Sequence, residues 1–597
     1  MVVIIVAAFS IGNLIISDDN SDRPLNVAMF DSGLNVDHIF REDIEIKDYS
    51  FAKEAYGYSK DFSATQDGTD HGDAVFGIFM ENLRYKNNIV FHNIRVIDNQ
   101  IDSIIQPEAL FAAILFATES LSIDIAILSL GSAYIAENFD RFLFDPFIDA
   151  NILVVAAAGN SGLGDSYQGV IASPAIYPDI VAVGAYLDND VEDYSSRGPT
   201  AFRTMKPDVI ATHERADILR GTSFTAPAAA AVAADIMIDY HIKNDQIPSA
   251  GYTKLVLMEG AVHSDSTLLL SEGAGKVNLD GSVEIMDTYS HLNYSMSEIF
   301  SVFPNELPIT PDFVWDGLQY TFSITITHAS KITDINDLEI EYLGTNQIFY
   351  NHEFYSDYTS LLRITFVAHD KDTNEIILRK GNFEKSISIN YIATIPDKII
   401  YFNSLMTDFA SSSTRYGTYN LLFQLLADQN IALIDDPLYS DIDNVLLIEP
   451  WSLFEDSTYN PLLEDITNKN ILSLYSIFNE NGDADFNNRG WNVNDNVLSE
   501  TIEIVDIAYK NQVFSIPYFG WSLVPMGPNQ QGKPITIVSG SHAGTVVGLI
   551  DAEWTSLLTN IPFTNDALLG LSNDFDDGFF DNFDFEFITI LFELFDP

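Results

Sequence analysis

Residues 221–234 read GTSFTAPAAAAVAA, a tight Gly-Thr-Ser turn that runs into a helix made almost entirely of alanine. Ser223 therefore lies at a helix N-terminus, where unpaired backbone N–H groups and the positive end of the helix dipole favour a developing negative charge. Pro227 fits the first helical turn, because a proline there gives up no hydrogen bond that the helix needs. Taken alone, such a turn is better interpreted as an ordinary N-cap. Whether Ser223 has a role beyond that of a cap depends on residues elsewhere in the chain.

The composition is that of a large, acidic chain without cysteine. Its 597 residues are enough for about three or four domains, and a hydrophobic content of 47% supports packed cores rather than disorder. The 29 Lys and Arg against 86 Asp and Glu give a net charge of −57, which disfavours nucleic acid and anionic membrane surfaces as partners and favours either solubility or basic substrates. The absence of cysteine excludes disulfides, thiol nucleophiles and thiolate metal ligands.

An apolar segment lies near the start of the chain. Residues 2–16 read VVIIVAAFSIGNLII and are followed by acidic residues. The segment is short for a membrane span and lacks the basic region of a standard signal peptide. We interpret residues 1–24 as the remnant of a signal peptide or signal anchor, with a buried N-terminal strand as the alternative. With this interpretation of the segment we expect an extracytoplasmic protein, secreted or membrane-anchored. No later segment is apolar for long enough to span a bilayer.

Four stretches that differ in hydrophobic pattern and composition follow. Residues 25–285 alternate short apolar strands with helical stretches, which predicts a parallel sheet with helices on both faces. Residues 295–397 carry β-branched runs of period two between turn residues and predict a β-sandwich. Residues 398–562 return to alternation and predict a second, smaller α/β domain. Residues 563–597 form an acidic, Phe-rich tail that we interpret as peripheral or disordered, with a binding motif as the alternative.

Short apolar runs bounded by turn residues locate the expected strands. In the first stretch these runs are Asn26–Phe30, Ile89–Val96, Ile123–Leu130, Ile152–Ala157 and Ile180–Ala185. In the predicted sandwich they are Tyr320–Thr327, Leu361–Ala368 and Ser386–Ile392. In parallel sheets, functional sites lie at the carboxyl ends of the strands, so the polar residues that follow the first set are the candidates for chemistry.

Four polar residues occupy such positions. Asp31 ends the first strand, His71 leads into an apolar helix, Asn160 follows a buried strand, and Ser223 begins the alanine helix. Hydrolysis by a serine needs a base for the hydroxyl proton, a carboxylate to orient that base, and donors for the oxyanion. Each residue alone has a structural explanation as a turn, helix or loop residue. All four together, in this order, favour a hydrolytic site.

These motifs resemble those of the subtilisin-like serine peptidases, the subtilases, over residues 25–285. The family's aspartate, histidine and serine motifs correspond here to FDSG at 30–33, DHGDAVFG at 70–77 and GTSFTAP at 221–227. The order Asp, His, Ser is that of subtilisin rather than of chymotrypsin or the α/β-hydrolases. Further matches lie at Ser129-Leu130-Gly131, Ala158-Gly159-Asn160, YSSRGP at 194–199 and KPDV at 206–209. We therefore expect a subtilisin-like fold for this part.

The resemblance implies a role for each matching residue in a serine endopeptidase. Ser223 would be the nucleophile, His71 the general base and then the general acid, and Asp31 the group that holds the imidazole. The Asn160 side-chain amide and the Ser223 backbone N–H would form the oxyanion hole. No cofactor is implied for catalysis, and a structural calcium, as many subtilases hold, has no recognisable loop in the sequence. The residues expected to flank a peptide substrate as extended strands are Ser129, Leu130, Gly131, Ala157, Ala158 and Gly159.

The chain departs from the family pattern in two places. Asp73 stands where the family usually has threonine. If its carboxylate points toward His71 it should favour the imidazolium form, so we expect an activity optimum alkaline of that of an Asp73→Thr variant. The usual propeptide has no counterpart between the apolar segment and the first strand, which indicates folding without one or an incomplete chain.

The domain layout resembles the site-1 protease branch of the family, in which a β-rich segment and an α/β domain follow the catalytic part. That branch is membrane-bound and prefers basic and apolar residues before the cleaved bond. The second α/β domain resembles the glutaminase-like domains of the flavodoxin-like class, which use a cysteine that this chain lacks. We interpret Gly540-Ser541-His542 as a loop and assign the domain to binding or scaffolding.

Two other hypotheses remain open. The chain could be a catalytically silent pseudo-peptidase that binds proteins, although the complete set of four residues counts against this. Alternatively, the C-terminal half could be the working part, with the peptidase processing only its own chain.

Overall fold

A computed structural model describes residues 23–52, 70–97, 107–131, 141–160, 171–307 and 314–402, apart from residues 199, 201–203, 217, 264–268, 345–346 and 370. Beyond these ranges it describes residues 427 and 430 and separate strands between residues 431 and 539. Residues 1–22 of the predicted signal or anchor segment, the tail 563–597 and the loop at Gly540 lie outside the described residues.

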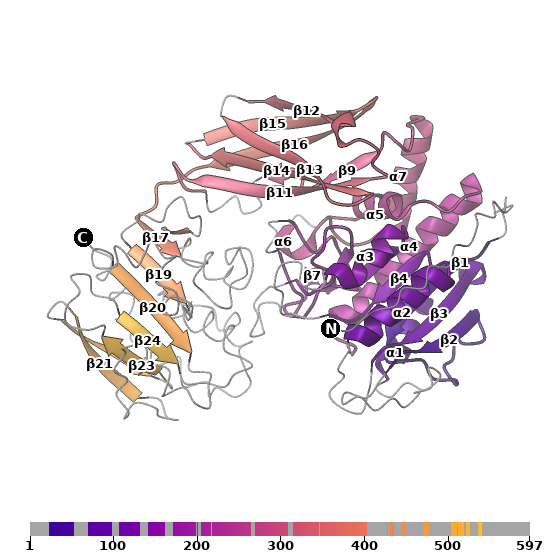
Figure 1. The fold of residues 1–597 in the computed structure, drawn as a ribbon, viewed down its shortest axis with the longest axis horizontal. Coiled ribbons are helices and arrows are strands. Elements are labelled where there is room, and N and C mark those ends of the chain that lie inside the picture. Colours follow the sequence, from indigo (N-terminus) through magenta and orange to yellow (C-terminus); the bar gives the residue numbers. More distant parts are fainter. Residues whose placement is uncertain are drawn as a thin grey trace, which may run out of the picture.

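The N-terminal part is built on a largely parallel sheet (Figure 1). Its strand order is β2-β3-β1-β4-β5-β6-β7, with β8 also paired to β6, and only the β6–β7 pair is antiparallel. The strands are β1 (Leu25–Asp31), β2 (Glu45–Ser50), β3 (Ile89–Arg95), β4 (Ile125–Leu128), β5 (Leu153–Ala157), β6 (Val181–Leu187), β7 (Asp190–Val191) and β8 (Val209–Ala211). Strands β3, β4 and β5 are buried along their whole length, as expected of a parallel sheet covered on both faces. This confirms the predicted parallel sheet.

Alternate residues of β1 pack against different helices, because successive side chains of a strand point to opposite faces. Val27 and Met29 share a core with α1, α4 and α5, whereas Ala28 and Phe30 share another with α2 and α3. The sheet therefore carries helices on both faces, as predicted. The helices are α1 (His71–Asn82), α2 (Pro107–Ser120), α3 (Arg141–Asp149), α4 (Thr222–Asn244), α5 (Ala250–Glu259), α6 (Leu269–Glu272) and α7 (Leu279–His291).

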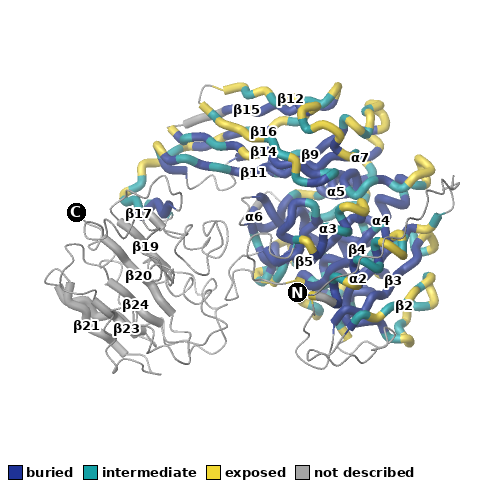
Figure 2. The backbone as a smooth tube through the Cα atoms, in the orientation of Figure 1, coloured by how far each residue is buried: buried dark blue, intermediate teal, exposed yellow. Residues whose placement is uncertain are grey.

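The alanine-rich helix α4 is the central helix of this part. Its residues from Ala226 to Ala231 are buried, and it packs against α1, α5 and several strands (Figure 2). Small side chains allow this close approach from several directions at once. The N-terminus of α4, which carries Ser223, is thereby held on a rigid element.

Two four-stranded sheets follow, with orders β10-β16-β15-β12 and β13-β14-β11-β9. The strands are β9 (Phe300–Phe303), β10 (Glu306–Leu307), β11 (Gln319–His328), β12 (Glu339–Leu343), β13 (Ile348–Phe354), β14 (Thr359–Val367), β15 (Lys371–Lys380) and β16 (Phe383–Ile392). The rings of Phe366 on β14 and Tyr391 on β16 stack 5.3 Å apart, so side chains of the two sheets meet. Helices α5 and α7 lie next to these sheets in Figure 1.

The strands beyond residue 397 form a six-stranded sheet with the order β18-β17-β19-β20-β24-β23. All its pairs are parallel except β23–β24. The strands are β17 (Lys398–Phe402), β18 (Ile431–Ile434), β19 (Asn444–Ile448), β20 (Asn470–Ser476), β23 (Trp521–Pro525) and β24 (Ile535–Ser539), beside a hairpin of β21 (Glu503–Tyr509) and β22 (Gln512–Tyr518). Across the part of the chain that the structure describes, no helix combines the length and the apolar character needed to cross a membrane.

Candidate active site

The contact between Asp31 and His71 joins the end of β1 to the first residue of α1. His71 Nδ1 lies 2.8 Å from Asp31 Oδ1, and the carboxylate is fully buried. The backbone N–H of Ser32 donates to the same Oδ1 at 2.7 Å, which fixes the carboxylate in place. Two glycines make the approach sterically feasible, because a Cβ on Gly72 would lie 2.0 Å from the Gly33 carbonyl oxygen.

The start of α4, which carries Ser223 as its second residue, lies beside this pair. The ring of Phe224, its neighbour in sequence, contacts the His71 ring with centroids 5.2 Å apart. The Ser129 hydroxyl donates to the Ser223 carbonyl oxygen at 2.7 Å and ties the turn to the chain after β4. Gly221 has a φ of 137°, a conformation that L side chains rarely adopt, so glycine is needed to form this turn.

The orientation of the Asn160 amide is set by α4. Its Oδ1 accepts hydrogen bonds from the backbone N–H of Thr222 at 2.8 Å and from the Thr222 hydroxyl at 3.0 Å. The same hydroxyl accepts from the backbone N–H of Gly159 at 3.1 Å. Because Oδ1 is committed as an acceptor, the Nδ2 group carries the donors that this side chain can offer to a ligand.

The expected substrate segments both lie next to the Ser223 turn, through the Ser129 and Gly159 bonds described above. The side chains of Leu130 and Ala158 face elsewhere, since both are buried in the core on the α2–α3 side of the sheet. A bound peptide would therefore meet mainly their backbone groups. Gly131 packs closely against the neighbouring chain, where a Cβ would lie 2.8 Å from the Ser173 carbonyl oxygen.

Asp73 is the third residue of α1 and lies against the turn that follows β1. Its carboxylate accepts a hydrogen bond from the Asn35 backbone N–H at 2.7 Å and another from the Asn35 side-chain amide. Its carbonyl oxygen lies 3.0 Å from His38 Nε2, and burial lowers the pKa of His38. Asp73 thus connects α1 to the loop that carries the aspartate motif.

Sequence reasoning assigned no role to Thr222, Phe224 or Asn35. Thr222 and Phe224 flank Ser223 in the quoted motif, so their position was the available signal. Asn35 gave no signal, because its partner lies 38 residues further along the chain.

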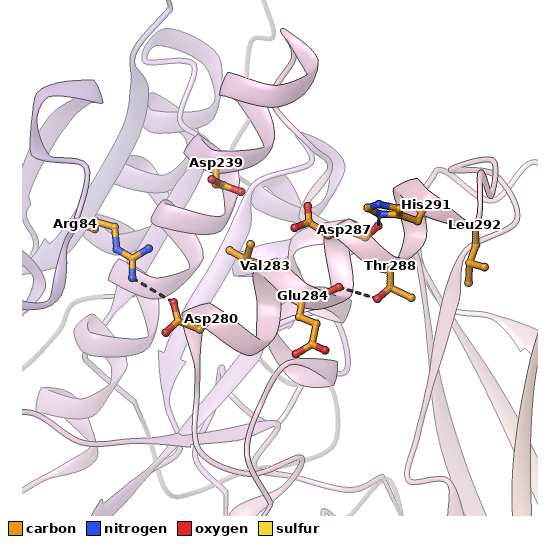
Figure 3. A pocket seen from close by; sticks show the side chains of 9 residues that line it. All are labelled: Arg84, Asp239, Asp280, Val283, Glu284, Asp287, Thr288, His291 and Leu292. Carbon is orange, nitrogen blue, oxygen red and sulfur yellow. Dashed lines mark hydrogen bonds and ion pairs between the residues drawn. The ribbon is translucent and has the colours of Figure 1, made fainter.

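Two further features bear on ligand binding. Nowhere in the described ranges do three or more His, Cys, Asp or Glu side chains form a group that could hold a metal ion. A cavity of about 660 Å³ lies along α4 and α7 and is rich in carboxylates, among them Asp239, Asp280 and Asp287 (Figure 3). These three pair with basic side chains: Arg84 lies 3.4 Å from Asp280, and Lys243 lies 2.9 Å from both Asp239 and Asp287. Asp31, His71, Asn160 and Ser223 are not among the residues that line this cavity.

Comparisons with known proteins bear on the N-terminal part. Residues 22–275 match the subtilase family, Peptidase S8. The chain is 25% identical over 296 residues to subtilisin-like protease SBT6.1 of Arabidopsis thaliana, covering 44% of this chain and 26% of that protein. It is 39% identical over 104 residues to serine protease AprX of Bacillus subtilis, covering 15% and 22%. It thus spans about a quarter of the length of these two relatives.

Among solved structures, the prenylagaramide maturation protease PagA aligns with a TM-score of 0.35 and 21% identity, over 45% of this chain and 95% of that one. Tripeptidyl peptidase 2 aligns with a TM-score of 0.40 and 17% identity, over 56% of this chain and 30% of that one.

In sequence, the chain is 30% identical over 188 residues to subtilisin DY of Bacillus licheniformis, which covers 30% of this chain and 67% of that protein. With the match over residues 22–275, this shows that the chain belongs to the subtilase family of serine peptidases.

Proposed function

We propose that this protein is a serine endopeptidase that hydrolyses peptide bonds of protein substrates through an acyl-enzyme on Ser223. The observation that carries the proposal is the 2.8 Å contact between His71 Nδ1 and Asp31 Oδ1, beside the Ser223 turn. With Nδ1 engaged by the carboxylate, Nε2 is the ring atom that can accept the serine proton.

The proposed reaction uses side chains and backbone groups of this chain alone and needs no cofactor. Ser223 Oγ attacks the scissile carbonyl carbon while His71 Nε2 takes its proton, and Asp31 stabilises the imidazolium. The Asn160 Nδ2 group and the Ser223 backbone N–H donate to the oxyanion of the tetrahedral intermediate. Collapse breaks the C–N bond, and His71 returns the proton to the leaving amine. Water then hydrolyses the acyl ester by the same steps.

The substrate in this proposal is a polypeptide bound as an extended strand. Backbone groups of residues 129–131 and 157–159 would pair with it, leaving the bond to be cut near Ser223. A net charge of −57 supports a preference for basic substrates, including basic residues before the cleaved bond. We place the protein outside the cytoplasm, secreted or anchored through residues 1–24, and keep a structural calcium as an unplaced element of the proposal.

The remaining parts complete a layout like that of the site-1 protease branch. We propose that residues 295–397 form a β-sandwich domain, supported by two sheets whose side chains meet. Residues 398–562 would form a flavodoxin-like domain, supported by the order β18-β17-β19-β20-β24, which corresponds to the 2-1-3-4-5 order of that class. Without a cysteine nucleophile, this domain would bind or scaffold.

A fluorophosphonate probe, which reacts with activated serines, tests the proposal on the full chain. The wild-type chain should be labelled and should cleave a denatured protein, whereas a Ser223→Ala variant should do neither. Ser290→Ala, at an exposed serine on α7, is the matched control and should behave like wild type. A folded wild-type chain that takes no label would favour the silent pseudo-peptidase instead.

Self-processing can be distinguished from general endopeptidase activity by the substrates that are cut. If the peptidase acts only on its own chain, the wild-type protein should cut the Ser223→Ala chain but leave unrelated proteins and peptides intact. The proposed endopeptidase should cut the unrelated substrates.

A further inference from the structure

We call the two four-stranded sheets of residues 300–392 the β-rich part, and residues 25–291 the peptidase part. The two parts meet at a buried carboxylate. Asp179 precedes β6, and its side chain is only 6% exposed. The Ser356 hydroxyl, in the turn between β13 and β14, donates to Asp179 Oδ1 at 2.5 Å. The Arg141 guanidinium lies 3.7 Å from Oδ2 and stacks 4.0 Å above the ring of Tyr355. A buried carboxylate needs such partners, because removing it from water is costly.

Asp179 belongs to a segment, residues 171–180, that supports residues 129–131 and 157–159; we call the place between them, where the peptide is proposed to bind, the peptide cleft. The Ala172 N–H donates to the Ala158 carbonyl oxygen at 2.8 Å, and Ser173 packs against Gly131 as described above. Both strands proposed to flank the peptide therefore rest on the start of this segment.

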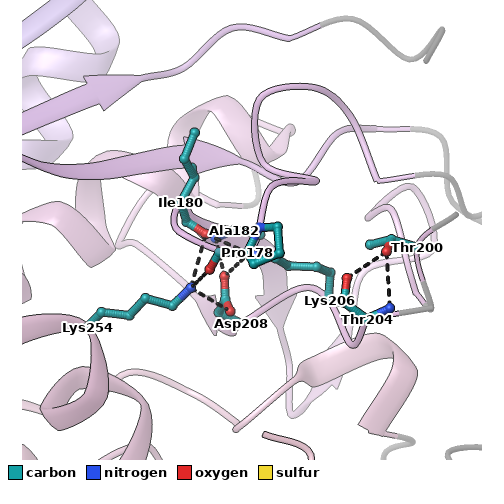
Figure 4. A network of polar contacts seen from close by, with 8 residues as sticks. All are labelled: Pro178, Ile180, Ala182, Thr200, Thr204, Lys206, Asp208 and Lys254. Atoms are coloured by element: carbon teal, nitrogen blue, oxygen red, sulfur yellow. Dashed lines mark hydrogen bonds and ion pairs between the residues drawn. The ribbon is translucent and has the colours of Figure 1, made fainter. Parts of the chain in front are cut away.

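The other end of the segment is anchored by two buried lysines (Figure 4). Lys206 Nζ donates to the Ile180 carbonyl oxygen at 2.6 Å, and Lys254 Nζ donates to that of Pro178 at 2.5 Å. Both ammonium groups also pair with Asp208, at 2.5 and 3.2 Å. Asp179 lies between the two carbonyl groups that these lysines hold.

A second contact joins the same two parts near Lys254. Ser249, the N-cap of α5, donates through its hydroxyl to the Ala329 carbonyl oxygen at 2.6 Å. The Gly251 backbone approaches the His328 carbonyl oxygen so closely that a Cβ would lie 2.2 Å away. The helix that carries Lys254 is therefore itself seated on the β-rich part.

We propose that Ser356 and Tyr355 are positioning residues for the peptide cleft. By holding Asp179 and Arg141 they fix segment 171–180, on which residues 129–131 and 157–159 rest. The inference relies on the proposed function of that cleft. Loss of the Ser356 hydroxyl leaves a buried carboxylate short of a donor, and the resulting shift should misplace an extended peptide while leaving the His71–Ser223 chemistry intact.

The test compares two substrates in the full chain, an extended peptide and the small ester p-nitrophenyl acetate, which does not need the cleft strands. For Ser356→Ala we expect kcat/KM on the peptide to fall about five- to tenfold, mainly through KM, with ester hydrolysis unchanged. Arg141→Lys, which keeps the charge but loses the stacking on Tyr355, should act in the same direction. Lys331→Ala removes an exposed pair with Asp357 in the same turn and should change neither rate.

Binding of a labelled peptide to the Ser223→Ala chain, with and without Ser356→Ala, gives a readout that does not depend on turnover. Weaker binding in the double variant supports the proposal even if the wild-type chain is inactive, in which case only the proposed function fails. Equal loss of peptide and ester activity, or unchanged peptide binding and KM, would overturn the positioning role.

Discussion

Two hydrogen bonds from Thr222 hold the Asn160 amide in one orientation. In the proposed mechanism, the Nδ2 donors would need no reorientation when the oxyanion forms, because Oδ1 is already held by Thr222. We expect Asn160→Ala to lower kcat by about 10²–10³ with little change in KM, because the donor acts on the transition state. Steady-state kinetics on a peptide substrate would measure this. Thr222→Ser keeps the hydroxyl and should be milder than Thr222→Val. A change confined to KM would contradict the assignment.

Asp73 bears on the pH dependence of activity. Side chains two residues apart on a helix do not face each other, and the Asp73 carboxylate is bonded to Asn35. We therefore expect Asp73→Thr to shift the acid limb of kcat/KM toward lower pH by less than about half a unit. The larger effect should be a lower thermal unfolding temperature, because the turn after β1 loses its anchor. A shift of a full unit would show that the charge does reach His71.

Asp208 is the anion that both buried lysines share. Burial lowers the pKa of Lys206 to about 7, an effect that the attraction of Asp208 opposes. Asp208→Asn would leave two ammonium groups without their counter-charge, so we expect it to destabilise the peptidase part by about 3–5 kcal/mol. Lys254→Met leaves one balanced pair and should cost less. Chemical unfolding of the full chain would compare the two, and an equal or larger cost for Lys254→Met would contradict this view.

At the scale of elements, a serine between two histidines joins three adjacent strands of one sheet. The Ser360 hydroxyl on β14 lies 3.0 Å from His328 Nε2 on β11 and 2.9 Å from His352 Nε2 on β13. Burial lowers the pKa of His328 to about 3 and also lowers that of His352. Both histidines are thus neutral in the folded protein at pH values where the unfolded chain already binds protons.

This arrangement predicts acid sensitivity of the β-rich part. Because the folded pKa lies below the ordinary 6.5, stability is complete above that pH and falls as pH drops from about 6.5 toward 3. The slope should approach about 1.4 kcal/mol per pH unit for His328. His328→Gln should flatten the fall, as measured by unfolding at several pH values. His369→Gln, at an exposed histidine, is the control, and equal slopes in all three proteins would refute the prediction.

The elements that the sequence predicted share a physical property, which is burial. The runs around β1, β3, β4, β5 and β6 are apolar because both faces of these strands are covered, and each was located from its sequence. The edge strand β2 reads EIKDYS and has no fully buried residue, so no apolar pattern marks it. Strand β13 also lies at the edge of its sheet and has no fully buried residue, so the sequence did not predict it either.

At the scale of the whole molecule, the peptidase and β-rich parts share an interface. The Tyr289 ring of α7 packs edge-on against Phe383 with centroids 5.7 Å apart, and Lys385 pairs with Glu259 of α5 at 2.7 Å. Phe300 of β9 is fully buried in the same core. A chain that ends near Ser290 would expose this apolar surface to water.

We therefore expect a chain that ends at Ser290 to be unstable or insoluble, whereas one that ends at Asp397 should keep the serine reactivity of the full chain. Thermal unfolding and fluorophosphonate labelling of both would measure this. The chain that ends at Asp397 is therefore the better reference for measuring what the part beyond residue 397 contributes. Equal stability and labelling of the two truncated chains would show that the interface contributes little.

The sequence by itself determined the family, the parallel sheet and the order of Asp31, His71, Asn160 and Ser223. This was feasible because turns, helix starts and apolar runs are local patterns. Only the tertiary structure decided which polar groups meet: Asn160 with Thr222, Asp73 with Asn35, and Ser356 with Asp179. These partners lie far apart in the chain, and no periodic pattern in the sequence indicates which distant group a polar side chain will bond to.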